Sequence, residues 1–242
     1  MVEPKTIVTQ GIVIRASNYR DNDKIVSIFT SEFGLISAKV KGARKANTKL
    51  KFASLPFCFA QFELSTYSEN AVVNNAVEIE NFFNITLDYN KYVYGVAILE
   101  LVEMVALSLD DYSLFYSVLV KALHTLCFTT LNPNLVFFRF ALGVFKMSGY
   151  QFNVDFCFRC GQVLTSAWWN HKTGELVCAD CISFGDFGLT ENFVSTIRQM
   201  VKLDFDKLDS VGEYNEHECC AFVQKNCELH FNRALNSIKQ LA

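Results

Sequence analysis

Four cysteines form the clearest chemical motif in this sequence. They stand as two C-x-x-C pairs, Cys157/Cys160 and Cys178/Cys181, with 17 residues between the pairs. Each C-x-x-C turn directs two thiolates toward one point, so two turns can supply the four sulfur ligands of a tetrahedral zinc ion. Gly161 directly follows the first pair and allows the backbone conformation that such turns often need. Because four thiolates leave no open coordination position, we predict one structural zinc ion per chain and no catalytic metal.

The same cysteines have other interpretations. They could be unrelated reduced thiols, or a single C-x-x-C pair could be a redox-active dithiol, but a redox motif needs only one pair. Two pairs at this separation are typical of zinc ligands. His171 lies between the pairs, yet a single loop histidine is more often a surface residue, so we leave it out of the ligand set. Near the C-terminus, Cys219, Cys220 and Cys227 have helical spacing and are expected to pack as small apolar side chains.

A run of cations near the N-terminus could bind polyanions. Residues 39–51 contain six Lys or Arg and no acidic residue, although the net charge of the chain is −3. Cations of this kind neutralise phosphates, so the run predicts a nucleic-acid-binding face. The alternative is a loop that is merely solvated, as most charge runs are. The predicted binding residues, which the family resemblance described below assigns to DNA, are Lys39, Lys41, Arg44, Lys45, Lys49 and Lys51, with Arg15, Arg20 and Lys24 as secondary candidates.

Signals of catalysis are weak. The chain has no G-x-x-x-x-G-K-[ST], no H-E-x-x-H and no G-x-S-x-G motif, so we do not expect an enzyme. The hydrophobic fraction of 51% excludes a mainly disordered chain. The most apolar long stretch, residues 92–109, contains Glu100 and Glu103, which favours a buried helix over a membrane span. With no signal-like N-terminus, we expect a cytoplasmic protein that does not contact the membrane.

The secondary structure that must position these groups is expected to change from strands to helices near residue 81. Before it, alternating apolar residues predict five strands, over residues 6–15, 24–30, 34–41, 56–65 and 70–80, which suit an OB-fold barrel. After it, helices are expected over residues 88–109, 110–128, 132–149, 190–203 and 216–241. The prediction is a multidomain α+β protein. Its parts are an OB-fold nucleic-acid-binding domain (1–81), a helical domain (82–149 and 189–242) and a zinc-binding insert (150–188).

Several local motifs resemble the bacterial DNA repair protein RecO family. They are the runs 11–15, 19–24, 28–30, 34–37 and 41–44, then Arg139-Phe140, and the stretch from Gly149-Tyr150 into Cys157. The resemblance covers nearly the whole chain. It implies a nucleoid-associated recombination mediator that binds single- and double-stranded DNA, anneals complementary strands and, with RecR, loads RecA onto strands coated by single-strand-binding protein (SSB). Two alternatives remain. The first is a zinc-stabilised OB-fold protein that binds RNA, and the second, which is less favoured, is a thiol oxidoreductase.

The resemblance also suggests where the acidic, apolar-tipped tail of SSB would bind. In the expected third helix, Arg139 and Lys146 are seven residues apart and therefore project from nearly the same side. Neighbouring apolar residues would supply a pocket: Phe137, Phe138, Phe140, Leu142 and Val144. Arg139 is predicted to contact the tail, with Lys146 contributing less. The alternative is a core helix whose two cations merely extend to solvent.

Overall fold

The computed structural model describes residues 5–67 and 70–241. Contacts within the chain divide it into two compact units. The first comprises Met1–Tyr92 and Val102–Cys127, and the second comprises Val93–Leu101 and Phe128–Ala242. Among the described residues, no helix is both long and apolar enough to cross a bilayer.

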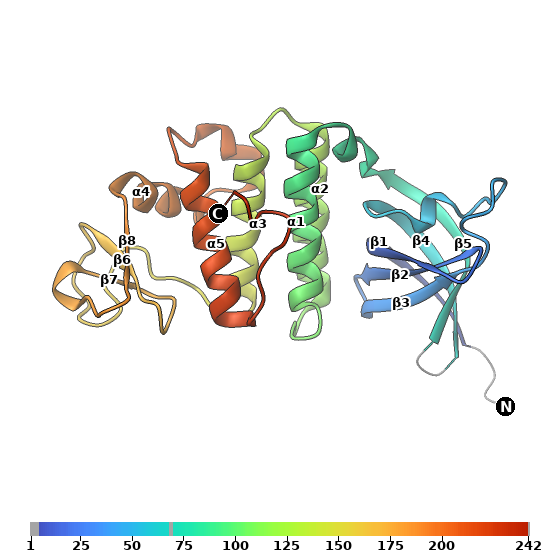
Figure 1. The fold of residues 1–242 in the computed structure, drawn as a ribbon, viewed down its shortest axis with the longest axis horizontal. Helices are drawn as coiled ribbons and strands as arrows, with labels where there is room; N and C mark the ends of the chain where they lie inside the picture. Colours follow the sequence, from blue (N-terminus) through green and yellow to red (C-terminus); the bar gives the residue numbers. More distant parts are fainter. Residues whose placement is uncertain (1–4, 68–69, 242) are drawn as a thin grey trace. The chain divides into compact units, whose positions relative to one another are not determined.

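The first unit contains a closed five-stranded barrel (Figure 1). Its strands are β1 (Lys5–Tyr19), β2 (Asp23–Thr30), β3 (Gly34–Val40), β4 (Cys58–Tyr67) and β5 (Asn70–Asn81). Their order around the barrel is β1-β2-β3-β5-β4, and β1 pairs with β4 to close it. The β3–β5 pairing is parallel, whereas all the other pairings are antiparallel. This arrangement confirms the predicted OB-fold barrel.

Strand alternation explains the barrel core. Successive side chains of a strand point to opposite faces, and in β3 Ala38 and Val40 are buried while Ser37 is exposed. In β4 the inward series is the predicted one: Cys58, Ala60, Phe62 and Leu64. The loop between β3 and β4 carries a short 3₁₀ helix, η1 (Phe52–Ser54), whose Ala53 joins this core. The basic segment is therefore fixed to the barrel at its C-terminal end.

Helix α2 (Tyr112–Phe128) covers part of the barrel within the first unit. The ring of Phe29 in β2 contacts the rings of Tyr112, Phe115 and Tyr116, with ring centres 5.4–6.5 Å apart. Gly34 has a φ of 64°, and a Cβ there would lie only 2.8 Å from the Tyr112 ring. The domain boundary at residue 81 stays a prediction, but by contacts residues 102–127 group with the barrel.

The second unit has an aromatic core. Its helices include α3 (Pro133–Met147), α4 (Glu191–Met200) and α5 (Glu216–Phe231), and the 3₁₀ helix η4 (Phe205–Ser210) follows α4. The Phe222 ring of α5 contacts three other rings. They belong to Phe138 in α3, to Phe152 in the segment that follows α3, and to Phe193 in α4. Asn132 accepts a hydrogen bond from the Asn134 amide and Pro133 begins α3, so this predicted helix start is confirmed. Helix α1 (Tyr89–Val105) contributes residues to both units.

The prediction of a C-terminal helix reaching residue 241 is wrong. Helix α5 ends at Phe231 because Asn232 adopts the left-handed conformation, with φ 52° and ψ 30°. The chain then folds back, and the Gln224 side chain accepts a hydrogen bond from the Leu235 N–H and donates one to the Leu235 carbonyl, at 3.0 and 3.2 Å. Leu235 and Ile238 are fully buried in this non-helical tail. Apolar spacing thus indicated burial but not helix.

The insert that contains the cysteines has a small antiparallel sheet in the order β7-β6-β8. Its strands are β6 (Ala167–Trp169), β7 (Leu176–Val177) and β8 (Phe187–Leu189), and a single 3₁₀ turn, η3 (Ala179–Cys181), follows β7. β6 and β7 form a hairpin in which Trp168 pairs with Val177. This hairpin delivers the second cysteine pair to its position.

Candidate metal centre and candidate nucleic-acid interface

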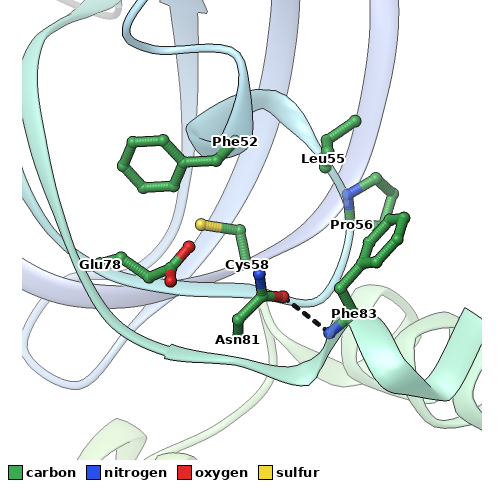
Figure 2. A pocket seen from close by; sticks show the side chains of 7 residues that line it. All are labelled: Phe52, Leu55, Pro56, Cys58, Glu78, Asn81 and Phe83. Atoms are coloured by element: carbon green, nitrogen blue, oxygen red, sulfur yellow. Dashed lines mark hydrogen bonds between the residues drawn. The ribbon is translucent and has the colours of Figure 1, made fainter.

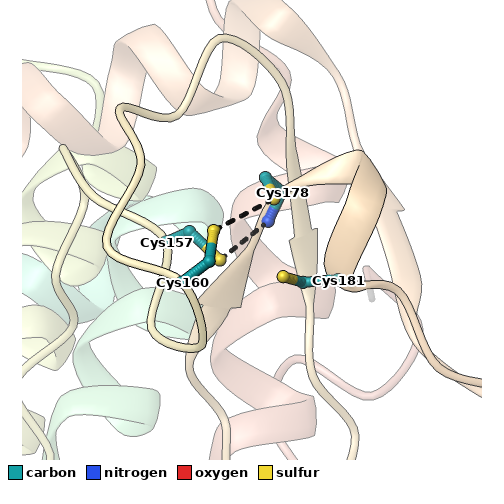
Figure 3. Close-up of side chains that lie close together, drawn as sticks. All are labelled: Cys157, Cys160, Cys178 and Cys181. Atoms are coloured by element: carbon teal, nitrogen blue, oxygen red, sulfur yellow. Dashed lines mark hydrogen bonds between the residues drawn. The ribbon is translucent and has the colours of Figure 1, made fainter.

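The four predicted cysteine ligands lie together (Figure 3). Their sulfur atoms are all within 4.8 Å of one another, and the Cys160 and Cys178 sulfurs are 3.7 Å apart. Around an ion with metal–sulfur bonds of about 2.3 Å, tetrahedral sulfur ligands stand about 3.8 Å from each other. The cluster therefore has the dimensions of a four-thiolate site that could bind a metal ion.

A hydrogen-bonded backbone turn presents each pair. In the first, the Gly161 amide donates to the Cys157 carbonyl at 2.9 Å, and Gly161 has a φ of 73°, which favours glycine. In the second, the Cys181 amide donates to the Cys178 carbonyl at 3.0 Å. Gly161 thus has the positive φ that this turn was expected to need.

Arg159 joins the two turns. Its Nη1 donates to the Cys181 carbonyl at 2.8 Å and to the Ser183 hydroxyl at 2.7 Å. The Cys178 amide in turn donates to the Cys157 sulfur at 3.3 Å. Burial by itself raises the pKa of Cys157, but hydrogen bonds from the backbone amides of Cys160 and Cys178 outweigh it and lower the pKa to about 6. A thiolate is the form that binds a metal.

His171 stands outside this cluster, as expected. Its Nδ1 pairs with the Asp186 carboxylate at 2.9 Å. Burial raises the pKa of Asp186, yet the hydrogen bonds from His171 and Ser183 more than compensate and lower it to about 2. Asp186 thereby fixes the loop that follows the second cysteine pair.

The C-terminal cysteines are packed, not reactive. Cys219, Cys220 and Cys227 are all fully buried. Burial raises the pKa of Cys227 to about 12. A low-pKa exposed thiol is what an oxidoreductase requires, so these three residues do not support that alternative.

Four of the nine predicted DNA-binding cations are engaged within the chain. The partners, with their distances, are Glu103 for Arg15 (2.9 Å), the Ser54 carbonyl for Lys24 (3.2 Å), Asp23 for Lys39 (3.0 Å) and the Asp21 carbonyl for Arg44 (3.1 Å). These side chains hold the barrel and its loop in place, so they are less available to a ligand than a free cation would be.

Asp23 connects the turn after β1 with the loop after β3. Its carboxylate accepts a hydrogen bond from the Gly42 amide at 2.8 Å and pairs with Lys39. The Gly42 hydrogen bond, followed by that of Lys39, lowers the pKa of Asp23. The Arg44 amide also donates to the Asn22 carbonyl at 3.0 Å. No short sequence motif links Asp23 to this face, because the two segments meet only through strand pairing.

The remaining cations of the loop are exposed. Within the described part of the chain, no hydrogen bond or ion pair engages the ammonium groups of Lys41, Lys45, Lys49 and Lys51. The guanidinium of Arg20 lies 5.2 Å from the centre of the Tyr19 ring, and the Lys39 ammonium lies 5.1 Å from the same ring. We call Lys41, Lys45, Lys49, Lys51 and Arg20, together with the Tyr19 ring, the basic platform.

Arg139 and Lys146 have different environments. The Arg139 Nε donates to the Leu203 carbonyl at 2.6 Å, and its guanidinium lies 5.6 Å from the centre of the Phe205 ring. Burial lowers the pKa of Arg139, whereas Lys146 is exposed. The expected apolar pocket is absent from these residues, because all five are buried in the core: Phe137, Phe138, Phe140, Leu142 and Val144. Helix α3 is thus a core helix, as in the alternative interpretation, but only Lys146 extends to solvent, whereas Arg139 bonds within the chain.

Comparison with known proteins identifies the chain. Residues 4–82 match the family model "Recombination protein O N terminal" and residues 86–239 match "Recombination protein O C terminal". The DNA repair protein RecO of Alkaliphilus metalliredigens is 28% identical over 239 residues, which cover 96% of this chain and 97% of that protein. The DNA repair protein RecO of Acetivibrio thermocellus is 25% identical over 245 residues, covering 96% of this chain and 98% of that protein. The barrel, the helices and the four-cysteine insert are therefore those of a member of the recombination protein O family, with a role in DNA repair and recombination.

Proposed function

We propose that this protein is a recombination mediator that binds single- and double-stranded DNA, anneals complementary strands and, with RecR, helps to load RecA onto SSB-coated single strands. The observation that carries the proposal is the basic platform on the barrel of a recombination protein O family member. Annealing brings two polyanions together, and it needs no covalent chemistry. Exposed cations that release counterions from both strands lower that repulsion.

The loop cations are suited to phosphates rather than to bases. Lys41, Lys45, Lys49 and Lys51 are exposed point charges on a loop, and such contacts neutralise the backbone without reading its sequence. The Tyr19 ring beside Arg20 and Lys39 adds an aromatic surface of the kind on which bases stack. The platform thus supports binding that tolerates many sequences, which annealing requires.

We further propose that the four-cysteine cluster binds one structural zinc ion. Four thiolates at tetrahedral spacing suit zinc, and they leave no position for a substrate or an activated water. The ion would link the turn at Cys157/Cys160 to the turn at Cys178/Cys181. Its role would be to stabilise the insert.

The proposed protein partners are RecR and the C-terminal tail of SSB. An acidic tail would need accessible cations on the helical unit. Lys146 is exposed, whereas Arg139 would have to give up its hydrogen bond to the Leu203 carbonyl before it could bind a carboxylate. The exposure of Lys146 supports the proposal that it is the first contact, whereas a tail that binds Arg139 would have to replace the Leu203 carbonyl.

An annealing assay with matched lysine variants tests the proposed function. Changing Lys45, Lys49 and Lys51 to Ala should slow annealing of complementary strands at least tenfold at physiological salt, because three exposed phosphate contacts are lost. The control changes three exposed lysines of the second unit to Ala: Lys172, Lys202 and Lys207. If both triple variants anneal like the unaltered protein, the basic platform does not bind DNA. Competition with RNA of the same sequence separates this function from RNA binding.

A further inference from the structure

A small pocket opens where η1 meets the last residues of β5 (Figure 2). Its volume is about 180 Å³, and its walls are Phe52, Leu55, Pro56, Cys58, Glu78, Asn81 and Phe83. For comparison, a cavity of about 150 Å³ in a protein core accepts one benzene ring. The pocket therefore has room for a single planar six-membered ring.

A carboxylate lies in this largely apolar pocket, just before a β-bulge. In the β4–β5 pairing, Phe59 lies opposite Glu80 but Ala60 lies opposite Glu78, so Ile79 is an extra residue. Before the bulge, Glu78 follows the inward-facing Ala76 by two positions and so shares its face of the strand. Figure 2 shows the Glu78 carboxylate near the Cys58 thiol and the Phe52 ring. Glu78 is exposed to solvent, so a polar partner from a ligand can reach its carboxylate.

Glu78 has no such partner within the chain. Among the described residues, its carboxylate makes no hydrogen bond and no ion pair. Asn81 differs, because its Oδ1 already accepts the Phe83 amide at 2.8 Å, which leaves its side-chain NH₂ as a donor (Figure 2). The pocket thus offers one strong acceptor, one donor and the faces of two phenylalanine rings.

We infer that this pocket receives one unstacked pyrimidine base of a bound single strand and prefers cytosine to thymine. The inference rests on the proposed function, because it assumes that a single strand binds the barrel. Lys51 directly precedes Phe52, and Lys49 lies two residues earlier, so phosphates bound at the basic platform deliver adjacent bases to this end of the barrel. The rings of Phe52 and Phe83 supply the apolar surface on which a base stacks.

The preference for cytosine follows from hydrogen-bond chemistry. A carboxylate only accepts hydrogen bonds, and cytosine presents an exocyclic amino group that donates them. Thymine presents a carbonyl oxygen at that position, and its single ring N–H is flanked by two carbonyl oxygens that repel the carboxylate. A purine is larger by a second fused ring, so it has less room than a pyrimidine in a pocket of this volume.

Equilibrium binding of short strands tests this assignment. With the full chain at fixed salt, a thymidine strand that contains cytosine at every third position should bind roughly fivefold more tightly than an all-thymidine strand of equal length, which corresponds to about 1 kcal/mol. In Glu78→Gln the ratio should fall to near one, because a glutamine amide can donate to thymine as well as accept from cytosine. The control Glu80→Gln removes the same charge from the same strand and should keep the ratio.

A second arm leaves the protein unchanged. Strands that carry N4,N4-dimethylcytosine lack the amino protons and should bind like the thymidine strand. If the unaltered protein binds both natural strands equally, the pocket assignment is wrong while DNA binding stands. If the preference survives either Glu78→Gln or dimethylation, the preference arises elsewhere and the assignment is again wrong. If neither strand binds, the proposed function itself fails, and this inference fails with it.

Discussion

Cys178 occupies the position at which the two halves of the cluster meet. Its sulfur lies 3.7 Å from that of Cys160, and its amide donates to the sulfur of Cys157. Loss of this one ligand would therefore remove a metal bond and leave three thiolates close together. At the residue scale, Cys178 is therefore the position at which to test the metal assignment.

Replacing Cys178 by Ser should reduce the metal content of the purified protein from one zinc ion per chain to near none. A serine hydroxyl stays protonated at neutral pH and does not replace a thiolate. Elemental analysis measures the loss, and hydrogen exchange should show faster exchange across residues 150–188 with the barrel unchanged. Asp180→Asn is the matched control, because Asp180 lies on the same 3₁₀ turn but outside the cluster. Zinc-free protein from the unaltered sequence, purified without chelators, would contradict the metal assignment.

At the scale of elements, one carboxylate fixes the geometry of the basic platform. Asp23 begins β2, and it holds both the Gly42 amide and the Lys39 ammonium. Because its folded pKa is lowered by these contacts, its contribution to stability is complete above its ordinary pKa of 3.8 and is lost as the pH falls below that value. The loop between β3 and β4 should therefore loosen in acid.

Asp23→Ala should increase hydrogen exchange over residues 42–48 at pH 7 and lower the midpoint of thermal unfolding. The variant leaves the Gly42 amide and the Lys39 ammonium without their partner. Asp21→Ala is the control, because Arg44 uses only the Asp21 carbonyl and not its side chain. Equal exchange in both variants would show that Asp23 does not hold the loop.

The elements also show what a sequence can and cannot predict. Alternation predicted the inward series of β4, since a strand has only two faces and one of them must be buried. The end of α5 was missed because it depends on the left-handed conformation of one residue, Asn232. The spacing of apolar residues carries no information about that conformation. The four ligands were predictable because their spacing is local. The Glu78 bulge and the Asp23–Lys39 pair depend on strand register, which no local pattern reveals.

At the scale of the whole molecule, charge is unevenly distributed along the chain. Residues 1–51 contain ten Lys or Arg and four Asp or Glu, whereas the remainder contains twelve and twenty-one. The protein is therefore acidic in total but basic where the platform lies. Its affinity for nucleic acid should depend on this local charge and should be strongly screened by salt.

The salt dependence of single-strand binding counts the contacts that the platform makes. In the Lys45, Lys49 and Lys51 triple alanine variant, the slope of log affinity against log salt should flatten by about 2, or about 0.7 for each lost phosphate contact. The loss of affinity should be similar for all sequences, because phosphate contacts carry no base information. Titrations at several salt concentrations measure the slope. An unchanged slope with weaker binding would mean that the variant is damaged in another way.

The division of contacts along the chain bears on how this protein could have arisen. The polypeptide passes from one compact unit to the other three times, after Tyr92, Leu101 and Cys127. The barrel strands end at Asn81, yet the rings that cover Phe29 come from residues 112–116. A gene cut once at the end of the barrel would separate Phe29 from its cover and split the first unit, whereas all residues of the second unit would stay in one piece. Exchange of the barrel alone between relatives would therefore have to bring α2 with it to keep Phe29 covered.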